Sequence, residues 1–204
     1  MADIPVDLYF VLDSSKSMKT STNLLAGASK EIAVKIAELT QDYRLGFGSF
    51  IEKPRIPFTK GKTSPAYAFH HIMNLTQDAS EFEEEVKHLI TKFQKNIDTP
   101  EAGLDAIAQA MLCPLAIGWD ENRKKIIIAM TDAEMHFAFD GILGGITDKF
   151  PMKKCRLDND RYDDQNDYDY PSFGQVIPRF FSIQTRHKPL KNVNIYYSHV
   201  CNLF

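Results

Sequence analysis

Three oxygen-bearing side chains stand at alternate positions near the start of the chain: Asp13, Ser15 and Ser17. They follow a mostly apolar run, residues 6–12, that predicts a buried strand. If the backbone stays extended beyond Asp13, the alternation directs all three oxygens to one side. One carboxylate and two hydroxyls form half of a site for a hard cation such as Mg²⁺, which takes about six oxygen ligands. The same residues also fit a polar turn in which Asp13 or Ser17 caps a helix.

The elements that must position these residues alternate between strand and helix. Apolar runs predict strands at 6–12, 44–51, 124–130 and 193–197. Apolar residues spaced by three and four predict helices at 25–39, 82–93 and 104–111. We therefore predict an α/β fold with a doubly wound, mostly parallel sheet flanked by helices.

Two more carboxylates are expected at the same edge of this sheet. Asp132 comes directly after the strand at 124–130, and Glu101 lies in a polar loop before a helix. Ligands of such sheets bind beyond the carboxyl ends of the strands. Because separate stretches supply these acids, they favour a cation site over a simple polar turn.

Composition limits the classes of function. The 204 residues, 44% of them hydrophobic and 25% charged, fit one globular domain. The net charge of -3 excludes a strongly basic nucleic-acid surface. No apolar run approaches the roughly 18 residues that span a bilayer, and residues 1–5 carry no signal-peptide pattern. We expect no nucleic-acid binding and no direct membrane insertion by this segment.

Six sequence blocks, in order, resemble the integrin β-subunit I-like domain, which is a von Willebrand factor A-type (VWA) domain. The blocks are residues 5–9, 44–50, 98–107, 117–119, 131–133 and 169–172. They predict a single domain over residues 1–204, with 5–175 well matched and 176–204 divergent and incomplete.

The resemblance implies two cation sites. Mg²⁺ or Mn²⁺ would be held by Asp13, Ser15, Ser17 and Glu101, with Asp132 nearby. An open position on this cation would accept an acidic side chain of a protein ligand. A second site for Ca²⁺ would use five groups: Glu52, Asn96, Asp98, the carbonyl of Pro100, and Glu101 again.

The chain departs from the family pattern at three places. Glu52 replaces the usual aspartate and is one methylene longer. Thr20 and Ser21 replace two acids of the family's third, regulatory cation site, so this site is expected to bind weakly. The specificity loop is shortened to about residues 60–64, so the ligand cannot be predicted by analogy.

The implied function is an adhesion receptor domain without catalysis, on the extracellular face of the plasma membrane. It would pair with an integrin α-type subunit and bind extracellular-matrix or cell-surface proteins. The resemblance also implies a Cys113–Cys155 disulfide and leaves Cys201 without a partner. Asn74 begins an Asn-Leu-Thr glycosylation sequon.

Other interpretations stay open at this level. An intracellular VWA-type scaffold would keep the same metal site, and a hydrolase would use the metal as a Lewis acid, although no general base is placed beside a nucleophile. A truncated or alternatively spliced product is a third hypothesis. We expect His70, His71 and His136 to be poor ligands for an oxygen-loving cation. Asp7 is expected to be a buried hydrogen-bonding residue, and residues 158–169 a solvated loop.

Overall fold

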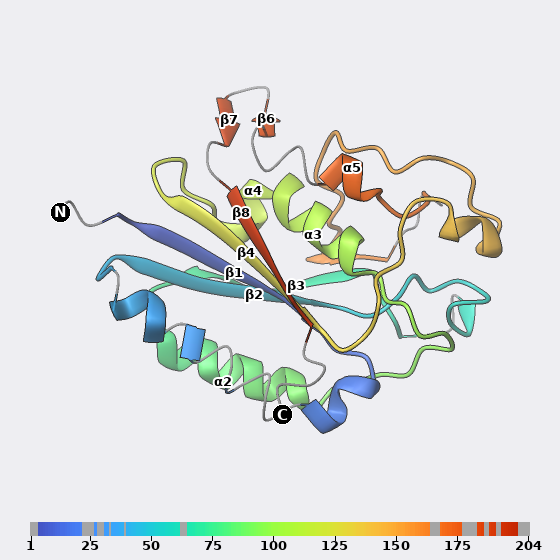
Figure 1. The fold of residues 1–204 in the computed structure, drawn as a ribbon, viewed down its shortest axis with the longest axis horizontal. Coiled ribbons are helices and arrows are strands. Elements are labelled where there is room, and N and C mark those ends of the chain that lie inside the picture. The colour runs from blue at the N-terminus through green and yellow to red at the C-terminus, as the bar shows by residue number, and fades with distance from the viewer. Residues whose placement is uncertain are drawn as a thin grey trace.

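The computed structural model describes residues 4–21, 27, 31–32, 34–38, 40–61, 65–163 and 168–176, together with three later strands. Its centre is a six-stranded sheet in the order β5-β3-β2-β1-β4-β8 (Figure 1). The parallel strands are β1 (Val6–Asp13), β2 (Tyr43–Phe50), β4 (Lys124–Thr131) and β8 (Val193–His199). Two strands at one edge are antiparallel, β3 (Phe69–Thr76) and β5 (Arg161–Tyr162). The predicted α/β fold with a mostly parallel sheet is confirmed.

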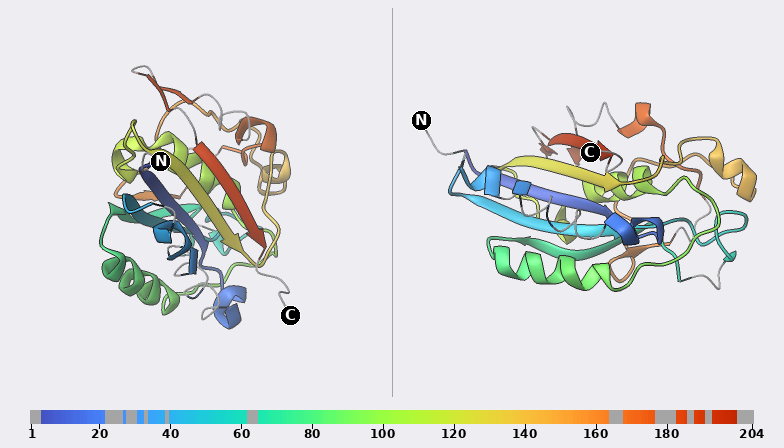
Figure 2. Two further views of the ribbon diagram at one scale, coloured as in Figure 1. Left: turned by 60° about the vertical axis from the view of Figure 1, so that its left-hand side comes forward. Right: turned by 60° about the horizontal axis from the view of Figure 1, so that its bottom comes forward.

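Helices cover both faces of the sheet (Figure 2). On one face lie α3 (Gly103–Leu112) and α4 (Pro114–Ile117), and on the other lies α2 (Ala79–Ile90). Tyr9 and Val11 of β1 belong to the core on the α3 side, whereas Leu8, Phe10 and Leu12 belong to the core on the α2 side. This alternation is the two-residue period of a strand that is buried on both faces. Asp7 and Asp13 have the same parity as Tyr9, so both point to the α3 side.

Shorter elements complete the description. They are the 3₁₀ helices η1 (Ser17–Ser21) and η3 (Asp140–Gly144), the helix α5 (Phe173–Val176), and a hairpin of β6 (Ile183–Thr185) and β7 (Lys188–Leu190). No helix within the described ranges has both the length and the apolar character needed to cross a membrane.

Several local predictions need correction. β3 was not predicted, because its polar residues interrupt the apolar pattern. Helix α2 begins before the predicted residue 82, because Asp78 caps it by accepting hydrogen bonds from the N–H groups of Ser80 and Glu81. The same helix ends at Ile90, so Phe93 lies beyond it.

Some predicted features lie wholly or partly outside the described residues. Within the helix expected at 25–39, residues 31–32 and 34–38 are helical, and Ile32 and Ile36 pack on the α2-side core. Residues 62–64 of the short loop and Cys201 are not among the described residues. The last predicted strand, 193–197, is present as β8.

A disulfide joins Cys113 to Cys155, with 4.5 Å between their Cα atoms. Cys113 is buried at the junction of α3 and α4, and Cys155 lies in the loop before β5. The predicted pairing is therefore present, and it fixes the end of α3 that lies far from Glu101 to a loop 42 residues later in the chain.

Candidate metal centre

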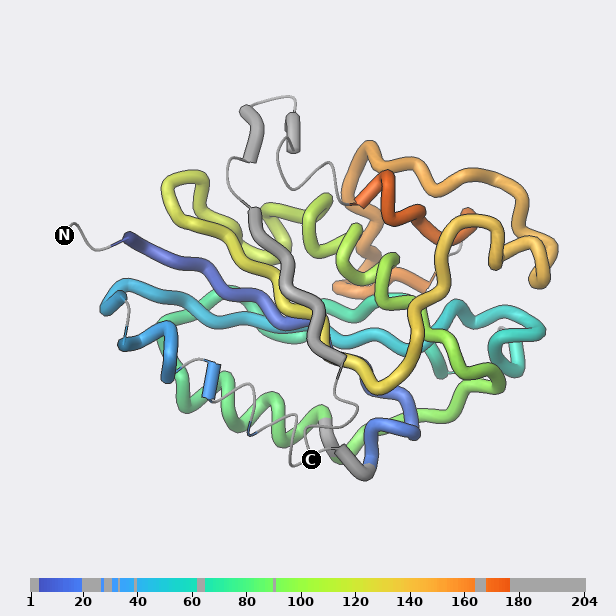
Figure 3. Tube along the Cα trace, in the orientation of Figure 1, coloured from blue at the N-terminus to red at the C-terminus, as the bar shows by residue number. Residues whose placement is uncertain are grey.

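Four chain segments meet at the carboxyl end of the parallel strands (Figure 3). Backbone hydrogen bonds hold them together: Gln94 N–H donates to the Ser14 carbonyl at 3.1 Å, and Ala102 N–H donates to the Ile51 carbonyl at 2.9 Å. Glu101 pairs with the loop after β4, since its N–H donates to the Glu134 carbonyl and its carbonyl accepts from His136 N–H, both at 2.9 Å. The loops after β1, β2 and β4 and the loop before α3 therefore form one framework.

A glycine allows two of these segments to approach closely. A Cβ atom on Gly103 would lie 2.6 Å from the Met135 sulfur, which is far inside van der Waals contact. A larger residue at the first position of α3 would therefore displace the Met135 side chain, which packs against this end of the helix.

The residues predicted for the first cation site are linked by hydrogen bonds. Asp13 Oδ1 accepts the Ser15 N–H at 2.7 Å, and Asp13 Oδ2 accepts the Thr131 hydroxyl at 2.6 Å. The Ser15 and Ser17 hydroxyl oxygens are 2.8 Å apart, and Ser17 donates to Asp132 Oδ1 at 3.0 Å. The fold thus brings Asp13, Ser15, Ser17 and Asp132 into one contiguous group.

Glu101 lies buried between the two predicted sites, with 2% of its surface exposed. Its Oε1 atom accepts the Asn96 amide at 2.8 Å, while its buried Oε2 atom has no hydrogen-bond partner in the described part of the chain. Burial, and then the charges of Asp13 and Glu52, raise the pKa of Glu101 to about 11. A carboxyl in this position is therefore strongly disfavoured as an anion unless a cation accompanies it.

The neighbouring carboxyls show the same effect. Burial is the largest cause that raises the pKa of Asp13 from 3.8 to about 6 and that of Glu52 from 4.5 to about 8. Within the described part of the chain, no Lys or Arg forms an ion pair with Asp13, Glu52 or Glu101. Lys53, next in sequence to Glu52, instead pairs with buried Asp105 at 3.0 Å.

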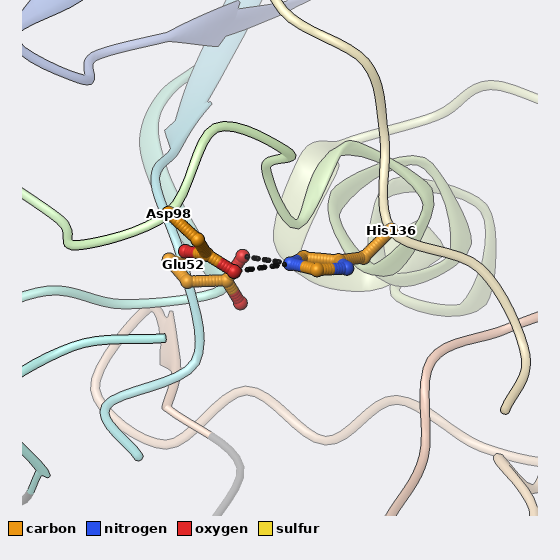
Figure 4. Close-up of side chains that lie close together, drawn as sticks. All are labelled: Glu52, Asp98 and His136. Atoms are coloured by element: carbon orange, nitrogen blue, oxygen red, sulfur yellow. Dashed lines mark hydrogen bonds and ion pairs between the residues drawn. The ribbon is translucent and has the colours of Figure 1, made fainter. Parts of the chain in front are cut away.

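A second group contains a residue that sequence reasoning had discounted. His136 Nε2 lies 2.9 Å from Asp98 Oδ2 and 3.3 Å from Glu52 Oε2 (Figure 4). One potential ligand atom from each of the three residues lies within 4.8 Å of the others. Asn96 donates to the Asp98 carbonyl at 2.9 Å, and Pro100 is half-buried in the same loop. The sequence did contain one indication of this role, because His136 follows Asp132 by four residues in the loop beyond β4.

The environment of His136 fixes its ring. Tyr170 stacks on it with ring centroids 4.5 Å apart, and Phe58 meets it edge-on at 5.0 Å. Burial alone lowers the pKa of His136. The hydrogen bond to Asp98 and the charges around it outweigh this effect and raise the pKa to about 9.

Other residues considered in the sequence are not part of the two carboxylate groups. His71 binds the Tyr9 hydroxyl at 2.7 Å and Asn74 Oδ1 at 2.6 Å, and Asn74 is exposed on β3. Thr20 and Ser21 lie in η1. In the acidic stretch 158–169, Asp169 is buried rather than solvated and accepts the N–H groups of Phe139 and Gly141, so the expectation of a solvated loop is wrong for this residue.

Proteins of similar sequence identify the family of this chain. Residues 1–187 match the family described as the integrin beta chain VWA domain. The chain belongs to this family. Integrin beta-6 of Rattus norvegicus and of Homo sapiens are each 38% identical to it over 193 residues, covering 87% of this chain and 24% of theirs. Integrin beta-7 of Mus musculus is 39% identical over 191 residues, covering 86% of this chain and 23% of its own.

This integrin β-type chain therefore spans about a quarter of the length of the curated relatives it matches. Among solved structures, a pilus adhesin, SpaC from Lactobacillus rhamnosus GG, aligns with a TM-score of 0.47 and 19% identity. The alignment covers 74% of this chain and 18% of the adhesin. The predicted family membership is confirmed by the sequence match alone.

Proposed function

We propose that this chain is the ligand-binding domain of an integrin β-type cell-adhesion receptor. It binds an acidic side chain of a protein ligand through a divalent cation, Mg²⁺ or Mn²⁺, held by Asp13, Ser15, Ser17 and Glu101. Asp132 contributes through its contact with Ser17. Family membership supports the adhesion-receptor role, and the arrangement of carboxylates supports the cation.

The observation that carries the proposal is the uncompensated charge at Glu101. Among the described residues its buried Oε2 atom has no hydrogen-bond partner, and the charges of Asp13 and Glu52 raise its pKa further. Isolated buried anions are costly, and proteins pair such groups or use them to coordinate metals. Divalent cations held by Glu101 together with the neighbouring oxygen ligands would supply the missing positive charge.

The donor set fits a hard cation. Carboxylate and hydroxyl oxygens are the ligands that Mg²⁺ and Ca²⁺ prefer, and Mg²⁺ in proteins keeps positions for water or a substrate oxygen. When bound, the cation would supply a site for a carboxylate oxygen of the ligand protein. The chain's own hydrogen bonds, from Ser15 N–H and Thr131 to Asp13, hold the ligating carboxylate in place.

The second part of the proposal is a Ca²⁺ site that shares Glu101. Its ligands are Glu52, Asn96, Asp98, the Pro100 carbonyl and Glu101. Glu52 and Asp98 each have a buried oxygen without a hydrogen-bond partner, which supports this set. A shared Glu101 would couple occupancy of the two sites.

Family membership and one exposed apolar surface support a protein partner for this chain. We assign an integrin α-type subunit as the partner. Its contact surface on this chain is an apolar patch around η3 and α5: Phe137, Phe139, Ile142, Leu143 and Phe173, each more than half exposed. The rings of Phe137 and Phe173 are 6.5 Å apart. Exposed apolar side chains gathered in this way are typical of protein-protein contacts.

Family membership and the disulfide both support an extracellular location for this domain. Structural disulfides persist outside the cell and are rare in the cytosol. The Cys113–Cys155 bond therefore favours an extracellular receptor over an intracellular VWA-type scaffold. Mass analysis of the native protein without reductant tests this choice, because two free thiols at Cys113 and Cys155 would support the scaffold.

A calorimetric titration with Mg²⁺ and Ca²⁺ is the decisive test of the sites. We expect two binding events for the wild-type chain and none for Glu101→Ala, since Glu101 serves both cations. Loss of only one event would contradict the shared ligand, and loss of neither would contradict both sites. Asp105→Asn tests general damage to α3, because Asp105 is buried on the same helix but is paired with Lys53.

Binding of a protein ligand needs a separate test. An immobilised Arg-Gly-Asp peptide should capture the chain, paired with an α-type subunit, in Mg²⁺ and release it in EDTA. Capture that persists in excess EDTA would contradict a cation-mediated contact. Turnover in a phosphatase or nuclease screen with Mg²⁺, lost in Asp132→Asn, would support the hydrolase alternative instead.

A further inference from the structure

His136 adds a nitrogen ligand to a place where oxygen ligands alone are expected. Its Nε2 atom faces two carboxylates, at 2.9 Å from Asp98 and 3.3 Å from Glu52 (Figure 4). Hard cations such as Ca²⁺ prefer oxygen, whereas imidazole nitrogen suits Zn²⁺ and other first-row transition metals. The group therefore has mixed ligand chemistry.

The opposite side of the imidazole is held as in many zinc sites. His136 Nδ1 lies 3.0 Å from Asp140 Oδ2, and this oxygen also accepts the Phe137 N–H at 3.0 Å. A carboxylate on the outer nitrogen orients the ring, so that a metal displacing the proton between Nε2 and Asp98 would meet Nε2 as the ligand atom, and it raises the basicity of that ligand. Stacking against Tyr170 restricts the ring plane further.

The carboxylates are also held in a receptive arrangement. Glu52 is fully buried, and its Oε1 atom accepts from the Tyr170 hydroxyl and the Lys53 N–H. Its Oε2 atom faces His136 at 3.3 Å and makes no hydrogen bond within the described residues. Asp98 likewise has a buried Oδ1 atom without a partner. The imidazole and two partly unsatisfied carboxylates thus converge from the segments that follow β2, precede α3 and follow β4.

The distances suit a small tetrahedral cation. With metal–nitrogen and metal–oxygen bonds of about 2.0–2.2 Å, neighbouring ligand atoms in a tetrahedron lie about 3.4 Å apart. The 3.3 Å separation between His136 and Glu52 already matches this value. The 2.9 Å separation between His136 and Asp98 needs to open by about 0.5 Å, which side-chain rotation can supply.

We infer that Glu52, Asp98 and His136 form a binding site for a first-row transition cation of the Zn²⁺ class, with Asp140 as the positioning residue for His136. The inference rests in part on the proposed function, because Glu52 and Asp98 also belong to the proposed Ca²⁺ site. The two cations would compete: Ca²⁺ uses the oxygen set with Asn96 and Glu101, and Zn²⁺ uses the set with His136. Zinc would then act as an antagonist of calcium at this one place and leave the Asp13 site unchanged.

The test measures metal affinity in the oxidised 204-residue chain, with Zn²⁺ and Ca²⁺ as the probes. Competition with a chromogenic chelator gives the Zn²⁺ affinity, and calorimetry gives the Ca²⁺ affinity. We expect His136→Gln to lower the Zn²⁺ affinity by at least about tenfold and to leave the Ca²⁺ affinity within about twofold. Asp140→Asn should lower the Zn²⁺ affinity by about tenfold through loss of the outer contact.

His88→Gln is the matched control, since His88 is exposed on α2. An unchanged Zn²⁺ affinity in His136→Gln, or an equal loss in His88→Gln, would overturn the inference. X-ray absorption of the zinc-loaded wild-type chain needs no variant. One imidazole nitrogen with carboxylate oxygens in the first coordination shell would support the site, and a shell of oxygens alone would refute it.

One further variant tests the proposed function independently of the zinc site. Asp13→Asn should abolish Mg²⁺ binding at the first site and leave Zn²⁺ binding at His136 unchanged. Mg²⁺ binding that survives this substitution would contradict the proposed function alone. Loss of Zn²⁺ in the same variant would contradict the zinc site alone.

Discussion

Asp7 and Asp13 lie near the two ends of β1, on the same face of the sheet, and both are fully buried. Asp7 receives two hydrogen bonds from Arg44, at 2.8 and 2.7 Å, and one from Arg123 at 2.7 Å. Asp13, in the described part of the chain, accepts hydrogen bonds from two neutral donors, Ser15 and Thr131. One strand therefore carries a compensated carboxylate near its start and an uncompensated one at its end.

The difference lies in how the charge of each carboxylate is balanced. A buried anion needs a partner charge, and breaking such a pair costs about 3–5 kcal/mol. At the Asp7 end the two arginines supply this charge from within the chain. At the Asp13 end the chain gathers Glu52 and Glu101 as well and supplies no arginine or lysine to these three in its described part. This difference supports the proposal that the Asp13 end binds a cation from solution.

The largest expected effect is at Asp7. Asp7→Asn removes the anion between Arg44 and Arg123, so we expect the free energy of unfolding to fall by about 3–5 kcal/mol. Urea unfolding with and without Mg²⁺ measures this effect. The loss should be the same in both conditions, and a loss confined to the Mg²⁺ sample would break the proposed division between the two ends.

The matched substitution Asp13→Asn should behave in the opposite way. Without metal, we expect a stability equal to or above that of the wild type, because a buried carboxyl with a raised pKa is removed. With Mg²⁺ at about one hundred times its dissociation constant, the wild type should gain about 2.7 kcal/mol and the variant nothing. Equal gains in both proteins would show that Asp13 is not a ligand.

Stability should fall with rising pH in the metal-free chain. The raised pKa values of Asp13, about 6, and Glu52, about 8, mean that the folded state holds protons that the unfolded state has released between about pH 4 and 8. Stability declines over a range where the folded state binds more protons. His136 acts in the same direction, because its pKa is raised to about 9 and the stability it contributes below about pH 6.5 is lost as the pH rises through 9.

From these three groups we expect a loss of about 2 kcal/mol in the free energy of unfolding between pH 5.5 and 6.5 in EDTA, measured by urea unfolding. Saturating Mg²⁺ and Ca²⁺ should remove most of this slope, because the cations replace the protons. A metal-free chain that becomes more stable over this range would contradict the uncompensated state of the carboxyls.

The smallest expected effect is at Tyr170, whose hydroxyl donates to Glu52. Tyr170→Phe keeps the ring that stacks on His136 and removes one hydrogen bond, so the free energy of unfolding should fall by about 1 kcal/mol. The Ca²⁺ affinity of the second site should fall by about tenfold, while Mg²⁺ affinity at Asp13 stays unchanged. Calorimetry measures the Ca²⁺ and Mg²⁺ affinities separately. An equal loss of affinity at both sites would argue against Tyr170 as a local support of Glu52.

Sequence reasoning located the Asp13 end because its signals are local. Residues 6–12 and 124–130 are apolar strands, and an acid directly after each must lie at the carboxyl edge of a parallel sheet. Asp7 was also interpreted correctly as a buried hydrogen-bonding residue. Its two arginines could not be predicted as partners, because Arg44 and Arg123 lie 37 and 116 positions away in the sequence.

The missed features depend on contacts that no local pattern encodes. β3 contains His70, His71 and Asn74, and its polar pairings, such as His71 with Tyr9, satisfy these residues only in the folded sheet. His136 was judged by its ring chemistry alone. Its placement against Glu52 and Asp98 arises from the pairing of Glu101 with the loop after β4, which joins segments about 35 residues apart.

That pairing also has a mechanical consequence. The backbone of Glu101 is hydrogen-bonded on both sides to the loop that carries Asp132 and His136. A pull on this loop therefore moves the first residues of α3 with it, and the disulfide at Cys113 anchors the other end of the same helix. Force applied through a bound ligand would be carried along α3 into the body of the domain instead of being absorbed by a loose loop.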